Sequence, residues 1–163
     1  GNLLLQFARE GGGGENAEAY RRELDLERAV ARVSYTCGGV KYEREYFASY
    51  PAKAIFVRLT ADKPILGFTA SFDSRLCVSV KAENRALQIT GQCPEHVDPS
   101  YVPLRENSVI QGTRGMHVEA AVRVLDCDGR ITEEGDKLHI AEASRCVLML
   151  SAMKRETAGE NAD

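Results

Sequence analysis

Glu43 and Glu45 are the two side chains in this sequence whose spacing comes closest to that of a catalytic pair. Residues two apart on a β-strand point to the same side, so the carboxylates would stand ~7 Å apart along the chain. That separation is near the ones used in the hydrolysis of glycosidic bonds. However, Lys41 shares their face, and Arg44 and Arg58 are close in the sequence. We therefore expect a solvated face of mixed charge here, and no catalytic residue.

Three further groupings could bind a metal or a phosphate, and each has a simpler explanation. His96 follows Cys93 at a spacing that a zinc ligand pair can use, but no second ligand pair accompanies it. Asp126 and Asp128 resemble the start of a calcium loop without its later oxygen ligands, which favours a hairpin turn. The glycine run at 11–14 lacks the lysine and hydroxyl residue of a phosphate loop, which favours a flexible connection. We expect no metal and no cofactor.

The segments that would position these residues alternate between apolar and polar types, as antiparallel strands with one buried face do. The alternation is clearest in residues 31–37, 55–61, 68–72, 76–80, 87–89, 118–124 and 138–140. Gly38-Gly39 predicts a tight hairpin turn, and a change of phase at Tyr46-Phe47 predicts a bulge. The unbroken apolar run at 146–150 is typical of a strand buried on both faces. About ten strands without crossover helices predict an all-β fold, a large antiparallel β-sandwich of two sheets with minimal helix.

Residues 91–115 interrupt this alternation. The segment contains three prolines and three glycines and has no sustained period. A loop of this length inside a compact domain is unusual and is often functional or covered by a partner. Its candidate contact residues are His96, Asp98, Tyr101 and Arg114.

Length and composition limit the possible classes of protein. A chain of 163 residues, 44% hydrophobic and 28% charged, predicts one ordinary globular domain, for which we expect residues 1–153, and a disordered tail at 154–163. The net charge of −3 argues against a nucleic-acid partner. No apolar run reaches the ~20 residues that a membrane-spanning helix needs, so we expect no membrane partner. A start at Gly1 is typical of an excised fragment, so any export signal of a parent protein would lie outside this chain.

The cysteines favour free thiols. There are five of them, which is an odd number, and none forms a C-x-x-C pair. A chain of this size needs no disulfides, so buried thiols and a reducing, cytoplasmic compartment are expected.

Several segments, in order along the chain, carry a resemblance to a known family. They are YRRELDLERAVARVSY from residue 20, GGVKYEREYFASYP from 38, VRLTADKP from 57, PEHVDPSYVP from 94, GTRGMHVEAAVRVL from 112 and VLMLSA from 147. Together they resemble the N-terminal domain of glycoside hydrolase family 95, the α-L-fucosidase family, over nearly all of residues 1–153.

The resemblance implies an enzyme of several domains. In this family an N-terminal β-sandwich precedes a helical linker, an α/α-barrel catalytic domain and a smaller β domain. The family hydrolyses α-linked fucose, and in some members α-galactose, with inversion. Its general acid is a Glu, an Asp with Asn partners activates the water, and all of these lie in the barrel. No motif containing them occurs in this chain, which implies a non-catalytic domain.

The implied partner is the α/α-barrel of the same polypeptide. The segment 91–115 is the part expected to reach it, with His96, Asp98, Tyr101 and Arg114 at the barrel interface or at the rim of its cleft. A fucosylated or galactosylated oligosaccharide would be the ligand at that rim.

A stand-alone carbohydrate-binding module is the alternative hypothesis. Such a module needs exposed, coplanar aromatic side chains, whereas the aromatic content is 7% with no tryptophan. Most of the tyrosines other than Tyr101 fall in strand positions, where packing in the core is expected. These other tyrosines are Tyr20, Tyr35, Tyr42, Tyr46 and Tyr50. Tyr101 is the best candidate for contact with a sugar.

Overall fold

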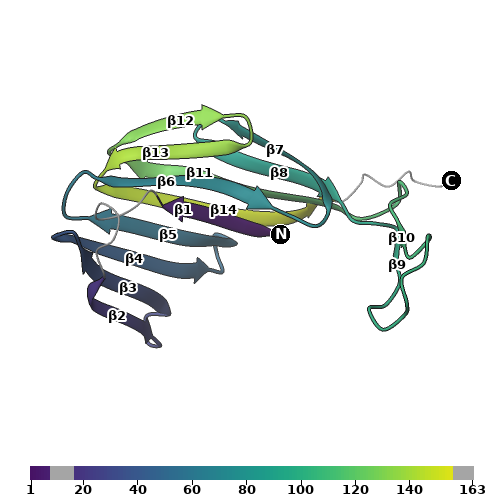
Figure 1. The fold of residues 1–163 in the computed structure, drawn as a ribbon, viewed down its shortest axis with the longest axis horizontal. Coiled ribbons are helices and arrows are strands. Elements are labelled where there is room, and N and C mark those ends of the chain that lie inside the picture. Colours follow the sequence, from purple (N-terminus) through teal and green to yellow (C-terminus); the bar gives the residue numbers. More distant parts are fainter. Residues whose placement is uncertain (8–16, 156–163) are drawn as a thin grey trace.

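The domain is a two-layer β-sandwich from which one arm projects (Figure 1). The computed structural model describes residues 1–7 and 17–155, and these form strands, turns and bends without any helix. The predicted all-β sandwich is therefore confirmed. Since the described residues hold no helix, none of them forms a helix that could cross a membrane. The glycine run and residues 156–163 lie outside the described residues, so the division into a domain and a tail stays a prediction. Strand β14, however, continues to Arg155, two residues past the expected boundary at 153.

The larger sheet holds eight antiparallel strands and spans the whole domain. Their order across the sheet is β2 (Glu18–Asp25), β3 (Val30–Cys37), β4 (Val40–Ser49), β5 (Ala54–Ala61), β14 (Arg145–Arg155), β11 (His117–Cys127), β8 (Ala86–Gln92) and β7 (Cys77–Glu83). The last strand in the sequence, β14, thus lies in the middle of the sheet, between β5 and β11.

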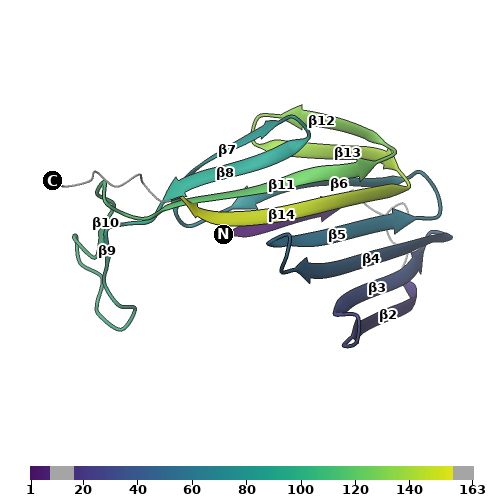
Figure 2. The same cartoon turned by 180° about the vertical axis from the view of Figure 1, so that it is seen from behind.

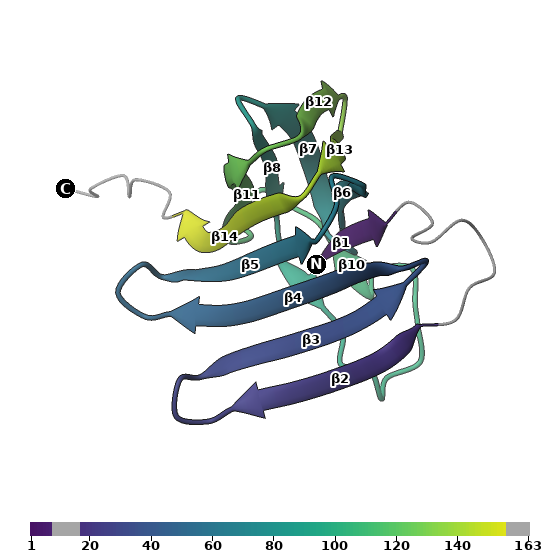
Figure 3. The same cartoon turned by 90° about the vertical axis from the view of Figure 1, so that its left-hand side faces the viewer.

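The smaller sheet holds four antiparallel strands and covers only part of the larger one. Their order is β1 (Asn2–Phe7), β6 (Leu66–Asp73), β13 (Lys137–Ala143) and β12 (Arg130–Glu134). Figure 3 shows β2 and β3 extending past this sheet. A further pair of short strands, β9 (His96–Val97) and β10 (Val109–Ile110), belongs to neither sheet and forms the arm.

Alternate residues of facing strands fill the space between the sheets. The larger sheet contributes fully buried side chains from four neighbouring strands, Leu59, Leu148, Val122 and Leu87. The smaller sheet contributes Leu66, Phe68 and Ala70 from β6 and Leu138 and Ile140 from β13. The apolar residues that alternate with a period of two in the sequence are therefore the ones whose side chains form the core.

Arg44 links the two sheets at the edge of this core. Its guanidinium carbon lies 3.9 Å from the ring centre of Phe7 on β1, and it donates a hydrogen bond of 2.6 Å to the Tyr35 hydroxyl. A guanidinium over an aromatic face is attracted by the negative charge of that face. The charge of Arg44 is thereby accommodated on the inner side of the sheet, where it holds β1 over β4.

Two local predictions need correction. The bulge expected at Tyr46-Phe47 is absent, since β4 pairs with β5 without a shift of register from Tyr42 to Ser49. Phe47 instead lies on the outer face of the sheet and stacks on Phe56 of β5, with ring centres 5.0 Å apart, so an apolar residue there needs no bulge. The 146–150 run does form a central strand, but only Cys146 and Leu148, on its inner face, are fully buried. Val147 and Met149 on the outer face are half-buried.

We expect the substitution Leu148→Ala to lower the free energy of unfolding by about 2–5 kcal/mol, because it leaves a cavity at the centre of the larger sheet. Urea denaturation measures the change. Leu4→Ala is the matched control, since Leu4 is about half exposed on the outer face of β1 and should cost under about 1 kcal/mol. An equal loss from both substitutions would contradict the position assigned to β14.

Candidate functional site

Glu43 and Glu45 lie on the outer face of the larger sheet, and arginines from both neighbouring strands hold them. Glu45 accepts hydrogen bonds of 2.5 Å from Arg32 Nη2 of β3 and from Arg58 Nε of β5. Glu43 lies 3.8 Å from each of the same two guanidinium groups. The expected face of mixed charge is what the strand register produces here.

The electrostatics of this cluster do not suit a catalytic acid. Partial burial raises the pKa of Glu45, but the hydrogen bonds from Arg32 and Arg58 outweigh it and hold the pKa below its usual value. A general acid in glycoside hydrolysis needs a raised pKa so that it carries a proton near neutral pH. Glu45 is instead a carboxylate that bridges three strands.

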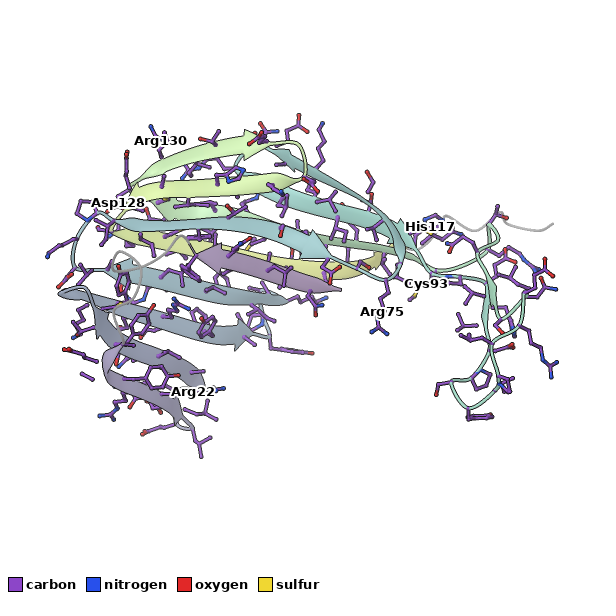
Figure 4. All side chains as sticks on the ribbon, in the orientation of Figure 1. Arg22, Arg75, Cys93, His117, Asp128 and Arg130 are labelled. Atoms are coloured by element: carbon purple, nitrogen blue, oxygen red, sulfur yellow. The ribbon has the colours of Figure 1, made fainter. Side chains whose placement is uncertain are left out.

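The candidate contact residues of the segment 91–115 all lie on the projecting arm or at its base (Figures 1 and 4). Figure 4 places Cys93 and His117 where the arm leaves the sandwich. On the arm, His96 Nε2 lies 2.8 Å from Asp98 Oδ1. The hydrogen bond from His96, followed by one from Ser108, lowers the pKa of Asp98. The structure therefore brings His96 and Asp98 together as one polar pair.

Tyr101 and Arg114 are not part of that pair. Tyr101 lies in a turn of the segment that connects β9 and β10, and its side chain is 85% exposed. The Arg114 side chain is also highly exposed and lies 3.4 Å from Glu95. Four candidate residues thus occupy one arm but form no single catalytic cluster.

Glu95 is the residue of the arm that sequence reasoning missed. Its Oε1 accepts hydrogen bonds from the backbone N–H groups of Thr113, at 2.6 Å, and Arg114. These two bonds lower the pKa of Glu95, and the bond from Arg114 has the larger effect. Gly112 has a φ of +54° and lies against the Glu95 side chain, so a side chain at 112 would collide with it. The sequence shows the glycine at position 112, but nothing in it indicates that Glu95, 17 residues earlier, is the neighbour of that glycine.

The surface of the arm is strongly apolar. Five of its apolar side chains are exposed: Val97, Tyr101, Leu104, Val109 and Ile110. Leu104 alone is 90% exposed. Only Ser108 of the arm is fully buried, where its hydroxyl accepts the Arg105 N–H at 2.7 Å. The arm thus has internal polar contacts and exposes several apolar side chains. Exposed apolar patches of this kind are typical of surfaces that contact another protein surface.

An apolar pocket of about 530 Å³ opens between the sheets near the base of the arm. Its lining includes Met116, which follows the arm directly, and Met153 near the end of β14. The remaining lining is mostly aliphatic and aromatic, with Leu3, Phe72, Leu76, Val78, Ile89, Val118 and Leu150. Few polar groups converge on it, so it suits an apolar side chain better than a sugar.

The residues considered as metal ligands, such as His96 and Asp128, do not come together in a metal site. Among the described residues, no group of three His, Cys, Asp or Glu side chains could hold an ion. The Asp128 carboxylate is already occupied, because it accepts hydrogen bonds from the Ser144 N–H and the Arg145 N–H, both at 2.9 Å, and from the Ser144 hydroxyl. Figure 4 places Asp128 at the end of the sandwich opposite the arm. It fastens the connection between β11 and β12. The hairpin turn predicted at Asp128-Gly129 is wrong, because β11 and β12 do not pair and belong to different sheets.

The thiols and tyrosines correspond in part to what was expected. None of the five cysteines forms a disulfide, but only Cys37 and Cys146 are buried and Cys77 is exposed. Tyr35 and Tyr42 pack in the core, whereas Tyr20 and Tyr50 are exposed.

Comparison with known proteins gives two matches. The model for the N-terminal domain of glycosyl hydrolase family 65 matches residues 1–156. Alpha-L-fucosidase 2 of Arabidopsis thaliana is 36% identical to the chain over 146 residues, which covers 82% of this chain and 17% of that relative. The chain therefore spans less than a fifth of the length of the curated relative that it matches.

The hydrogen bonds that Asp128 accepts predict a dependence of stability on pH. They lower the pKa of Asp128 from 3.8 to about 2 in the folded state. The carboxylate therefore contributes its full stabilisation above pH 3.8, and this contribution is lost as the pH falls through about 2. Asp128→Asn should lower the urea midpoint near neutral pH, and the difference from the wild type should shrink below 3.8.

The matched control is Asp136→Asn, which changes an exposed aspartate in the turn between β12 and β13. It should leave the urea midpoint unchanged. A difference between the wild type and Asp128→Asn that stays constant down to pH 2 would show that the loss has another cause.

Proposed function

The chain belongs to the family of glycosyl hydrolase family 65 N-terminal domains, and from this membership we propose that it packs, as a non-catalytic β-sandwich, against the α/α-barrel catalytic domain of a larger hydrolase. The sequence resemblance to an N-terminal glycoside hydrolase domain is confirmed, with a relative that is an α-L-fucosidase. The parent reaction we propose is the inverting hydrolysis of α-L-fucosides or α-galactosides.

The observation that carries the proposal is the apolar surface of the arm. Val97, Leu104 and Val109 expose aliphatic surface on a segment that projects away from the sandwich. Removing such surface from water gains about 25 cal/mol per Å². A partner domain that covers the arm would supply this gain and would fix the orientation of the sandwich relative to the barrel.

The polar residues of the arm fit the rim of a cleft in this arrangement. His96 and Asp98 offer a preformed pair of hydrogen-bonding groups beside the apolar surface. Arg114 and Tyr101 supply exposed donors, and the Tyr101 ring also offers a face for stacking. Such groups orient a sugar or a neighbouring loop without taking part in bond cleavage.

The sandwich itself contributes no acid or base to the reaction. Its best-placed carboxylate, Glu45, is held ionised between Arg32 and Arg58. The general acid and the water-activating groups would come from the barrel.

The alternative function is a stand-alone carbohydrate-binding module. One observation favours it, because Tyr50 and Tyr101 are 92% and 85% exposed. They belong to different elements, the turn between β4 and β5 and the segment that connects β9 and β10, and so provide no shared platform for a sugar chain.

The docking role predicts that the paired substitutions Leu104→Ser and Val109→Ser loosen the parent enzyme. Both side chains are exposed in this domain, so its own folding should be unaffected, while contact with the barrel is lost. We expect faster hydrogen exchange across residues 96–110 and earlier proteolytic separation of the domains.

The control is Leu24→Ser, which changes an exposed leucine on the edge strand β2. It should leave both measurements as in the wild type. If residues 96–110 exchange equally fast in wild type and double variant, the arm is not the docking surface.

A glycan array separates the two functions. The 163-residue chain should bind no glycan with appreciable affinity, because its exposed Tyr50 and Tyr101 lie on different elements. It should also release no product from an aryl α-L-fucoside, because Glu45 is ion-paired with Arg32 and Arg58. Binding that Tyr50→Ala or Tyr101→Ala abolishes would favour the module, and turnover by the chain alone would contradict the proposal of a non-catalytic domain.

A further inference from the structure

We propose that Cys127 and Cys146 form a reversible cross-strand disulfide on oxidation, at the end of the sandwich opposite the arm. Cys127 is the last residue of β11, and Cys146 is the second residue of β14. The two are direct partners in the register of these neighbouring central strands. The observation that carries the inference is this opposed pair of thiols.

The local hydrogen bonding shows which kind of pair this is. The Asp128 N–H donates to the Arg145 carbonyl at 3.3 Å, so the next pair along the ladder, Asp128 with Arg145, is a hydrogen-bonded one. Because hydrogen-bonded and non-hydrogen-bonded pairs alternate, Cys127 and Cys146 form a non-hydrogen-bonded pair, for which the Cα atoms lie ~4.5 Å apart. A disulfide needs Cα atoms roughly 4.4–6.8 Å apart, so the backbone can accept the bond without separating the strands.

Both side chains point to the inner side of the sheet. Cys146 is completely buried in the core, and Cys127 is partly buried against it. A shift of register between Val124 and Asp126 lies just before Cys127, and this bulge sets Cys127 opposite Cys146. The sequence spacing of the two cysteines gives no hint of this arrangement.

The difference in burial assigns a role to each thiol. Burial is the main cause that raises the pKa of the Cys146 thiol well above its usual value. The charge of Cys127 and the hydrogen bond with it raise this pKa further. Cys146 is therefore a poor first nucleophile, since the thiolate is the reactive form. Cys127 is more accessible and would react first with an incoming oxidant.

The oxidant is a small-molecule disulfide such as oxidised glutathione. The Cys127 thiolate attacks one sulfur of that disulfide, forms a mixed disulfide and releases one glutathione thiolate. The Cys146 sulfur, on losing its proton, then attacks Cys127 Sγ, forms the Cys127–Cys146 bond and releases the second glutathione thiolate. The protons of the two cysteines end on the two released thiols, and a reducing dithiol reverses both steps.

The bond would join the two places where the chain leaves and re-enters the larger sheet. Between them, residues 128–145 carry β12 and β13 of the smaller sheet. Closing this loop limits the freedom of the unfolded chain, so the oxidised domain should be harder to unfold.

Two other cysteines face a different residue type in the strand register and serve as controls. Cys37 is opposite Val40, and Cys77 is opposite Gln92. Cys77 is exposed, so it would give a mixed disulfide with glutathione without an internal bond.

The test uses the 163-residue chain, first fully reduced and then equilibrated with oxidised glutathione. After alkylation of the remaining thiols, non-reducing peptide mapping should show a cross-linked peptide pair that contains Cys127 and Cys146. The melting temperature of the oxidised wild type should exceed that of the reduced form by roughly 5–10 °C. Dithiothreitol should reverse both effects.

Cys127→Ser should abolish the cross-link and the temperature shift, whereas Cys77→Ser should retain both. Because the mapping and the shift are measured on the wild type, the result does not depend on the folding of any variant. Recovery of Cys127 as a stable glutathione adduct, or of both cysteines as alkylated thiols, would overturn the proposal.

Discussion

The pairing of β14 with β5 on one side and β11 on the other is the interaction on which the rest of the domain depends. Strands β2 to β5 pair in sequence order, and β7 pairs with β8, so each group can form from nearby residues. Strand β14, the last strand of the described chain, pairs with β5 and β11, and β11 in turn pairs with β8, so these two strands join the groups into one sheet. Strand β14 also supplies Cys146 and Leu148 to the centre of the core. The fold is therefore dominated by contacts distant in sequence, and such folds form slowly.

The charged groups of the sandwich serve to hold strands in register. Glu45 joins β3, β4 and β5 through two arginines, and Asp128 fastens the turn after β11 to the start of β14. Arg44 does the same between the sheets through the Phe7 ring. In each case a charge meets partners from neighbouring elements and is not left to act on a substrate. The outer face of the larger sheet, seen in Figure 2, thus presents paired charges beside the Phe47–Phe56 stack.

The arm contrasts with the sandwich in how it uses its side chains. Some of its polar groups make internal contacts, such as Glu95 with the amides of residues 113 and 114, while several apolar groups face outward. An isolated domain gains nothing from this distribution. It does suit the proposed docking role, in which a partner domain covers the apolar surface of the arm. In that role the sandwich provides a rigid base and the arm provides the contact.

The sequence by itself determined the strands, their buried faces and the one segment that departs from them, because these depend on a residue period of two and on local turn chemistry. It also predicted the family, through the resemblance of several segments, and the face of mixed charge at Glu43 and Glu45, through the nearby charges. Only the tertiary structure decided the place of β14, the partner of Glu95 and the opposition of Cys127 and Cys146. Each of these rests on strand order and on register shifts such as the one at Val124, and these follow from packing the whole core. A local sequence pattern contains no information on such distant pairings. It could therefore predict that residues 91–115 depart from the strand pattern, but not that Glu95 binds the amides of residues 113 and 114.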